Sequence, residues 1–293
     1  MQYHKVLILG TKGMLGQALV EELENKNYEV VALNHADLDV TDELAVKNKI
    51  CEISPDLVIN TTAVNLVDEI EKDNQVFETA KKVNGDAVGF LINVADSRGI
   101  PFVHFSTNYV FGGSNQEGYR EDHAARPISR YGETKLLGEE KLLRKAKKYY
   151  LIRISRLFGK AGKSARSKIS FVDLMLDLVL NKKKEHLDVV EDEVCSPTYA
   201  PDAARFTREL VEGDYPWGIY HGANEGGCSW YEFAKKIFEM KNIRVNLTPV
   251  KSDFFPRPAK RPKYSVLLNT KLPKQRKWEE ALREYLNQNS FSS

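Results

Sequence analysis

The stretch Val6-Leu7-Ile8-Leu9-Gly10-Thr11-Lys12-Gly13-Met14-Leu15-Gly16 joins a short apolar run to a glycine-rich turn and then to a helical pattern. Gly10 permits the tight turn, Gly13 lets the backbone approach a pyrophosphate, and Gly16 allows close packing of the helix. Free N–H groups and the helix dipole at the start of that helix favour an anion. A purely structural turn is the alternative, but its place directly after a first strand favours a dinucleotide site.

Short apolar, β-branched runs alternate with helical patterns through the first half of the chain. Strands are predicted over 5–9, 29–33, 57–60, 102–106 and 150–154, and helices over 14–25, 73–97 and 129–148. Runs that are apolar throughout suit a parallel sheet covered on both faces. The order of strands and helices predicts an α/β fold with a Rossmann-type doubly wound parallel sheet.

The second half of the chain has a mixed pattern. Residues 160–168 are basic and small, which is typical of a surface loop, and the prolines within 255–262 exclude a helix or a central strand. Helices are predicted over 200–212, 229–240 and 277–287. We therefore expect a dinucleotide-binding domain over 1–160 and a smaller C-terminal substrate-binding lobe over 161–293, from which about 199–222 returns to the first domain.

Composition argues against several classes of protein. The 43 Lys and Arg residues against 41 acids give a net charge of +2, so no bulk attraction to nucleic acid is expected. No apolar run approaches the roughly 20 residues of a spanning helix, and no secretion signal is evident, so we expect no membrane role and a cytoplasmic location. Cys51, Cys195 and Cys228 lack C-x-x-C spacing and are interpreted as reduced thiols. No metal site is predicted, because acids such as Asp192 and Glu193 are interpreted as solvated surface.

The residues after the second predicted strand bear on the choice of cofactor. A carboxylate at this place usually holds the 2′-hydroxyl of NAD and repels the 2′-phosphate of NADP. This chain has Asn34 and His35, so NADPH is permitted and weakly favoured, with NADH as the alternative. Asp39, which is followed by Val40, could meet the adenine amino edge, and a capping or solvated role is an equal alternative.

A tyrosine and a lysine four residues apart indicate the chemistry. Tyr131 and Lys135 share one face of a predicted helix, so the ammonium should lie near the phenol and the cofactor ribose and lower the phenol pKa from about 10. Thr107 ends the fourth strand and can donate a hydrogen bond to a carbonyl. Tyr-x-x-x-Lys alone occurs by chance in many helices. With the glycine turn before it, the set predicts hydride transfer to a carbonyl, with Tyr131 giving the proton.

The chain resembles the dTDP-4-dehydrorhamnose reductase family of extended short-chain dehydrogenases over nearly its whole length. The motifs that carry the resemblance are residues 10–16, 37–41, 58–63, 67–68, 106–112, 131–135, 138–139, 153–155, 196–198, 218–221, 228–234 and 256–259. The resemblance implies reduction of the C4 ketone of a dTDP-6-deoxy-4-hexulose to dTDP-L-rhamnose, with NADPH or NADH.

Site residues follow from the motifs and the resemblance together. The catalytic group is Thr107, Tyr131 and Lys135. The predicted cofactor contacts are Gly10, Gly13, Met14, Leu15, Gly16, Asn34, Asp39, Val40, Thr62, Ala63, Tyr131 and Lys135. The predicted substrate contacts are Val67, Asn108, Tyr109, Arg156 and Arg257. The Arg257 guanidinium suits a pyrophosphate or sugar hydroxyls, with a surface ion pair as the alternative.

Two departures from the family pattern keep other interpretations open. Asn108 stands where the family commonly has Asp, and Arg156 stands where it has Trp, so a different nucleotide-linked 4-keto sugar is one alternative. Another is a non-catalytic NADP-binding regulatory subunit that resembles the methionine adenosyltransferase beta subunit. A dehydratase is disfavoured because Asn108-Tyr109 replaces its acid/base pair, and the resemblance disfavours an epimerase. A homodimer is also left open.

Overall fold

The computed structural model describes residues 3–164, 169–213 and 215–288. Its centre is a sheet of six parallel strands in the order β10-β5-β4-β3-β1-β2. These strands are β1 (Lys5–Leu9), β2 (Glu29–Leu33), β3 (Leu57–Asn60), β4 (Phe102–Thr107), β5 (Tyr149–Ile154) and β10 (Gly218–His221). Because β1 pairs with β2 on one side and β3 on the other, the order reverses beside β1, where such folds bind ligands. The predicted fold class is confirmed.

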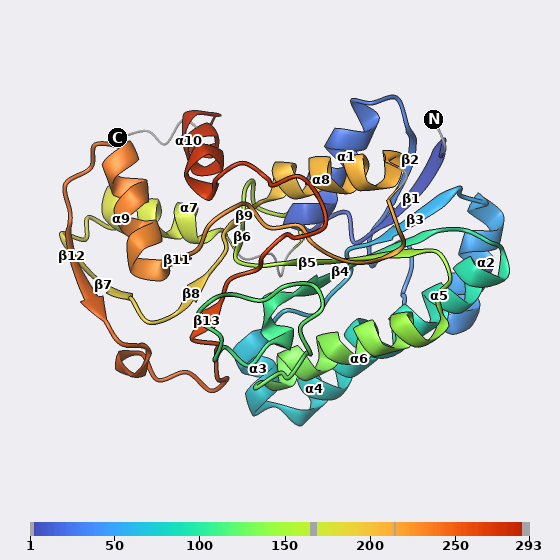
Figure 1. The fold of residues 1–293 in the computed structure, drawn as a ribbon, viewed down its shortest axis with the longest axis horizontal. Coiled ribbons are helices and arrows are strands. Elements are labelled where there is room, and N and C mark those ends of the chain that lie inside the picture. The colour runs from blue at the N-terminus through green and yellow to red at the C-terminus, as the bar shows by residue number, and fades with distance from the viewer. Residues whose placement is uncertain (1–2, 165–168, 214, 289–293) are drawn as a thin grey trace.

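Helices cover both faces of this sheet (Figure 1). On one face lie α1 (Met14–Glu24) and α8 (Ala200–Glu212), and on the other lie α2 (Glu43–Ile53), α5 (Ala87–Ser97) and α6 (Arg130–Lys145). Alternate residues of β1 explain the two layers, since successive side chains of a strand point to opposite faces. Val6 and Ile8 belong to the core under α1, whereas Leu7 and Leu9 belong to the core under α2 and α5.

The helix predicted over 73–97 is interrupted. It consists of α4 (Asn74–Lys81), a π-helical turn η1 (Lys82–Asp86) and α5, and it follows the short α3 (Val67–Lys72). A methyl group on Gly85 would clash with Leu137, and one on Gly138 would clash with the Asn84 carbonyl oxygen. The small residues therefore let α6 lie directly against η1. This contact helps to set the position of α6 relative to the sheet. Two of the predicted catalytic residues lie on α6.

Residues far along the chain return to the sheet. Strand β10 pairs with β5, and α8 packs against α1. Both elements lie within 199–222, the segment expected to rejoin the dinucleotide-binding half.

The remaining elements lie beside the carboxyl ends of the strands, and most of them enclose a separate core, called here the second core (Figure 1). They are η2 (Asn108–Val110), β6 (Leu157–Phe158), α7 (Phe171–Leu176), η3 (Asp177–Asn181), β7 (His186–Val190), β8 (Val194–Cys195), β9 (Thr198–Tyr199), β11 (Cys228–Ser229), α9 (Trp230–Met240), β12 (Asn246–Val250), η4 (Ser252–Phe254), β13 (Tyr264–Ser265) and α10 (Trp278–Gln288). Phe158, Phe233 and Trp278 are buried at its centre. As predicted, residues 255–262 form neither helix nor strand, and the described part of the basic loop, 160–164, is irregular.

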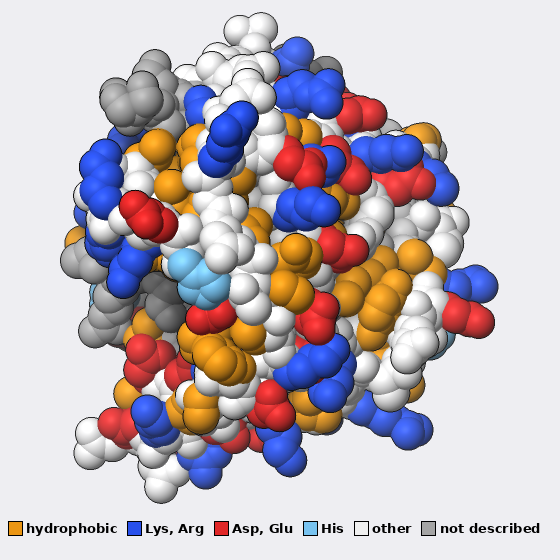
Figure 2. Space-filling view, turned by 90° about the vertical axis from the view of Figure 1, so that its left-hand side faces the viewer, with side chains coloured by type: hydrophobic (Ala, Val, Ile, Leu, Met, Phe, Trp, Pro, Cys, Tyr) orange, Lys and Arg blue, Asp and Glu red, His pale blue; other side chains and the backbone are white. Residues whose placement is uncertain are grey.

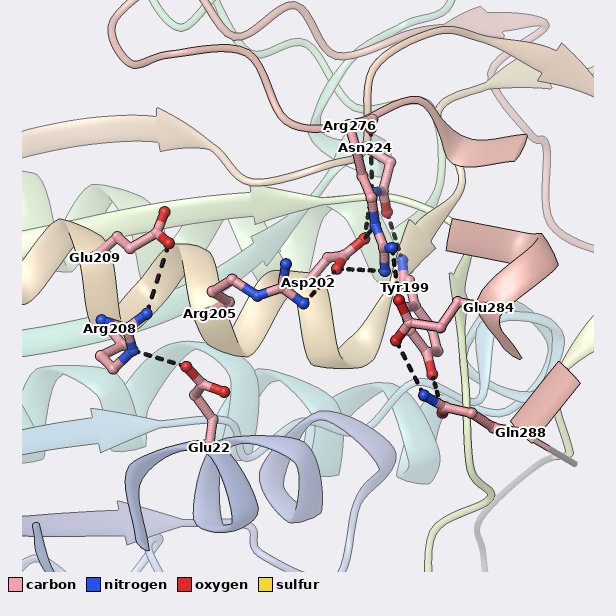
Figure 3. Close-up of polar contacts among 10 residues, drawn as sticks. All are labelled: Glu22, Tyr199, Asp202, Arg205, Arg208, Glu209, Asn224, Arg276, Glu284 and Gln288. Carbon is pink, nitrogen blue, oxygen red and sulfur yellow. Dashed lines mark hydrogen bonds and ion pairs between the residues drawn. The ribbon is translucent and has the colours of Figure 1, made fainter. Parts of the chain in front are cut away.

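A buried carboxylate joins the two cores (Figure 3). Asp202, in the first turn of α8, accepts two hydrogen bonds of 2.8 Å from the Arg276 guanidinium, one from Arg205 and one from Asn224. Arg276 also pairs with Glu284 of α10. Since only 2% of Asp202 is exposed, this network is a strong link between the helix on the sheet and the C-terminal helix.

Charges of both signs are interspersed over the end of the molecule that carries the second core (Figure 2). Lys and Arg side chains alternate with Asp and Glu around small hydrophobic patches, and no single sign dominates this face. Within the described ranges, no helix is both long and apolar enough to cross a membrane.

Candidate active site

The glycine-rich turn forms a cradle at the start of α1. Gly10 has φ of +86°, and the carbonyl oxygen of Leu33 accepts hydrogen bonds from the N–H groups of Gly10 and Thr11. A methyl group on Gly16 would lie 2.5 Å from the Gly10 carbonyl oxygen. Gly13 caps α1 without a side-chain hydrogen bond, and the first turn holds no acid. The N–H groups of that turn, which includes Met14 and Leu15, remain available to an anion, so the cradle fits a dinucleotide pyrophosphate.

The residues after β2 are held by local hydrogen bonds. Asp37 accepts from the backbone N–H of Asn34 at 2.9 Å and from its side-chain amide. Asp39 accepts from the backbone N–H and the hydroxyl of Thr41, and these two bonds lower the pKa of Asp39. One Asp39 oxygen is thereby committed to the turn before α2, while Val40 is buried beside it in the core.

Two buried asparagines hold the loop after β3, and one of them, Asn84, also ties it to α6. Asn60 accepts from the backbone N–H and hydroxyl of Thr62, which precedes Ala63. The Asn84 side chain bonds both backbone groups of Val64 and donates to the Thr134 hydroxyl at 2.9 Å. Sequence reasoning missed Asn84. The available signal was a polar side chain within a run that otherwise reads as helix.

Thr107, Tyr131 and Lys135 are brought together at the carboxyl end of β4. They come from β4 and from the first two turns of α6, whose N-cap Ser129 accepts from the Gly132 N–H. All three side chains are buried. Tyr131 forms a side-chain hydrogen bond with Thr107, and the Lys135 ammonium donates to the Phe105 carbonyl oxygen at 2.8 Å.

Burial dominates the ionisation of these groups. It raises the pKa of Tyr131 above its usual value of 10, and the hydrogen bond with Thr107 opposes this only in part. Burial also lowers the pKa of Lys135 from 10.5 to about 8, opposed by the Glu139 carboxylate. The expectation that Lys135 lowers the Tyr131 pKa is therefore wrong for this structure, because desolvation raises that pKa, the hydrogen bond with Thr107 is what opposes it, and the Lys135 ammonium is bonded to Phe105.

Three of the predicted substrate contacts lie beside Thr107 or Tyr131. Tyr109 packs its ring edge-on against Tyr131 with centroids 5.4 Å apart, and Val67 belongs to the same cluster. Burial raises the pKa of Tyr109 to about 12. Asn108 accepts from the Thr107 hydroxyl and donates to Ser265 at 2.8 Å.

The two predicted arginines are already engaged by the protein. Arg257 forms an ion pair with Glu193, whose side chain is only 7% exposed. The expectation that Glu193 is solvated is wrong, because the guanidinium of Arg257 and the indole N–H of Trp230 supply its buried partners. Arg156 donates to the backbone carbonyl oxygens of Cys228 and Glu193.

A third arginine near the site was not predicted from the sequence. Arg261 is bonded through both terminal nitrogens to Asp68, in the first turn of α3, and its charge acts on Tyr109. This ion pair connects the proline-containing segment 255–262 to α3. Among the described residues, no group of three or more His, Cys, Asp or Glu side chains is arranged to hold a metal ion.

Comparisons with known proteins agree with this geometry. The RmlD substrate binding domain family matches residues 4–291. The chain is 36% identical to the spore coat polysaccharide biosynthesis protein SpsK of Bacillus subtilis (strain 168), over 98% of each chain. It is 34% identical to a dTDP-4-dehydrorhamnose reductase of Streptomyces griseus, over 95% of this chain and 91% of the relative. The structure of a Bacillus anthracis dTDP-4-dehydrorhamnose reductase in complex with NADP superposes with a TM-score of 0.90 and 34% identity, over 98% of this chain and 99% of the other.

Proposed function

This chain belongs to the dTDP-4-dehydrorhamnose reductase family, and we propose that it reduces the C4 ketone of a nucleotide-linked 6-deoxy-4-keto-hexose. The substrate that we favour is dTDP-4-dehydro-L-rhamnose, which gives dTDP-L-rhamnose. The observation that supports this most directly is the buried Thr107–Tyr131–Lys135 group at the strand edge beside the glycine cradle. NADPH is the favoured reductant, because the Bacillus anthracis relative was solved with NADP and neither Asn34 nor His35 repels a 2′-phosphate.

Each catalytic residue has a distinct part in the reaction. The reduced nicotinamide, when bound, supplies the hydride to the carbonyl carbon. Tyr131 gives the proton to the carbonyl oxygen, and its raised pKa means that the phenol carries this proton at neutral pH. Thr107 donates a hydrogen bond to the same oxygen once its hydroxyl turns away from Asn108. With a pKa of about 8, Lys135 is mostly an ammonium at neutral pH and holds the cofactor ribose.

The two halves of the molecule divide the binding. We assign the dinucleotide to residues 1–160 together with about 199–222, and the sugar nucleotide mainly to the rest of 161–293, with a border of residues from the first domain. Gly10, Gly13, Gly16 and the N–H groups of Met14 and Leu15 hold the pyrophosphate. The adenosine lies along Asn34, Asp39 and Val40, and Thr62 and Ala63 border the cofactor on the sheet side. Val67, Asn108, Tyr109 and Arg257 line the substrate side.

The regulatory-subunit alternative is disfavoured by the same residues. A subunit that only binds a dinucleotide has no need of Thr107, Tyr131 and Lys135 together in one buried group. A different 4-keto sugar stays as the second candidate, since Asn108 and Arg156 depart from the family pattern.

We also propose a cytoplasmic location, because all three cysteines are free thiols, as is usual in a reducing compartment. The mass of the protein in solution tests the homodimer alternative.

Loss of NADPH absorbance with dTDP-4-dehydro-L-rhamnose tests the proposal. Tyr131→Phe should reduce kcat by about 10² to 10⁴, the usual contribution of a positioned general acid. Tyr28→Phe is the matched control, because it removes a tyrosine hydroxyl bonded to Glu212 of α8, on the opposite face of the sheet from α6. Full activity in Tyr131→Phe would contradict the mechanism. An inactive wild type that still binds NADPH would favour the other candidates.

A further inference from the structure

Arg156 has the geometry of a clamp. It lies between β5 and β6 with a left-handed φ of +41°, and its guanidinium donates to the Cys228 carbonyl oxygen at 2.9 Å and to the Glu193 carbonyl oxygen at 3.1 Å. Cys228 belongs to β11 and Glu193 directly precedes β8, and these two strands pair antiparallel. The guanidinium thereby joins two segments that are distant in the sequence.

The same guanidinium lies on an aromatic ring. Its central carbon is 3.7 Å from the centre of a Trp230 ring, which is close contact for a cation over an indole face. The Arg156 Nε is buried, and no partner for it occurs among the described residues. With two nitrogens bonded to backbone and one face against Trp230, Arg156 has little freedom to meet a ligand itself.

Trp230 also holds the carboxylate of Glu193 in place. Its indole N–H donates to Glu193 Oε2 at 3.1 Å, and the other Glu193 oxygen is paired with Arg257. A carboxylate buried to this degree is costly unless its oxygens are bonded, so the position of Glu193 depends on these neighbours. Arg156 fixes the Glu193 backbone, and Trp230 fixes its side chain.

Glu193 in turn leaves part of Arg257 available. The carboxylate engages the two terminal nitrogens, and a guanidinium carries five N–H donors in a rigid plane. The remaining donors suit phosphate oxygens. Arg257 and Glu193 both act electrostatically on Tyr109, which packs on Tyr131, so the cluster borders the catalytic group.

We propose that Arg156 is a positioning residue that acts through Trp230 and Glu193 to aim the Arg257 guanidinium at the diphosphate of the substrate. This inference rests on the proposed function and replaces the direct substrate contact expected of Arg156. It also explains how a cation can occupy this position beside the site without adding a free charge to it.

Binding of dTDP, measured by calorimetry on the whole protein, tests the proposal. Arg156→Gln should weaken dTDP binding about tenfold, because a misaimed Arg257 loses roughly one charge-assisted hydrogen bond. The KM for the sugar nucleotide should rise by a similar factor while kcat changes less than about twofold, and the affinity for NADPH should stay unchanged. Trp230→Phe keeps a ring under Arg156 but loses the indole N–H, so we expect a smaller loss.

Non-additivity separates positioning from direct contact. If Arg156 acts through Arg257, then Arg156→Gln combined with Arg257→Gln should bind dTDP no more weakly than Arg257→Gln alone. Arg208→Gln is the control, since it removes a largely buried, ion-paired arginine on α8, away from this cluster. It should leave dTDP binding unchanged.

Several results would overturn the proposal. Additive losses would mean that Arg156 touches the ligand, and unchanged dTDP binding in Arg156→Gln would mean that it does not position Arg257. Either result leaves the reductase function intact if the wild type binds dTDP and turns over. A wild type that does neither would overturn the function and this inference together. If Arg156→Gln fails to fold, unchanged binding in Trp230→Phe is the refuting result.

Discussion

Replacing Lys135, which we propose holds the cofactor ribose, with Met should stabilise the protein while abolishing the proposed activity. The ammonium is fully buried, and burial lowers the pKa of Lys135 from 10.5 to about 8. Each unit of pKa corresponds to about 1.4 kcal/mol. Keeping the Lys135 charge in the folded state therefore lowers the free energy of unfolding by about 3 kcal/mol at neutral pH. Loss of the hydrogen bond to the Phe105 carbonyl oxygen offsets about 1 kcal/mol of that. Lys135→Met should therefore raise the free energy of unfolding by about 2 kcal/mol.

The pH dependence identifies the cause. Because the pKa of Lys135 is lower in the folded state, the cost is fully present below a pH of about 8 and disappears as the pH rises toward 10.5. Wild-type stability should rise through this window relative to Lys135→Met. Near pH 10.5 the variant should no longer be more stable than the wild type, because the neutral Lys135 amine carries no charge and still donates to the Phe105 carbonyl oxygen.

Urea unfolding of both proteins measures this difference directly. The two are compared at neutral pH and again at about pH 10, so groups common to both cancel. Lys141→Met is the control, because Lys141 lies on the same helix in a partly exposed pair with Asp86. A Lys135→Met protein that is less stable than wild type at neutral pH, or whose difference from wild type is independent of pH, would refute the reasoning.

Three further predictions concern the scaffold of the site. Asp202→Asn should lower the free energy of unfolding by about 2 to 3 kcal/mol, because it weakens the buried partner of Arg276. Urea titrations measure this loss, and an unchanged free energy of unfolding would contradict the network of Figure 3. Gly16→Ala should weaken NADPH binding at least about tenfold in fluorescence titrations, because the methyl group would lie 2.5 Å from a carbonyl oxygen of the turn; wild-type affinity would refute the cradle. Glu139→Gln leaves Arg153 without its buried carboxylate partner and should lower the free energy of unfolding by about 3 to 5 kcal/mol. It should also move the alkaline limb of kcat against pH, set by the pKa of Lys135, to lower pH, whereas an unmoved limb would contradict that coupling.

Local patterns in the sequence predicted much of the fold. The five predicted strands match the structure to within one residue at each end, from β1 to β5. The helices predicted over 200–212, 229–240 and 277–287 likewise match α8, α9 and α10 within one residue. Apolar periodicity and glycine spacing act between near neighbours in the chain, so they are legible without the fold. The π-helical turn within 73–97 was not predicted, because it depends on how closely Gly138 brings α6 to Asn84.

The sequence by itself predicted the parallel sheet and the glycine cradle, and it singled out Thr107, Tyr131 and Lys135 as the catalytic group that we propose. The tertiary structure alone decided their ionisation, because desolvation depends on what covers a side chain and not on its neighbours in sequence. It also decided that Glu193 is buried, although two adjacent acids read as surface, and that its partners are Trp230 and Arg257. These partners lie 37 and 64 residues away along the chain. No local pattern records such pairs, since only the packing of the second core against the strand ends brings them within bonding distance.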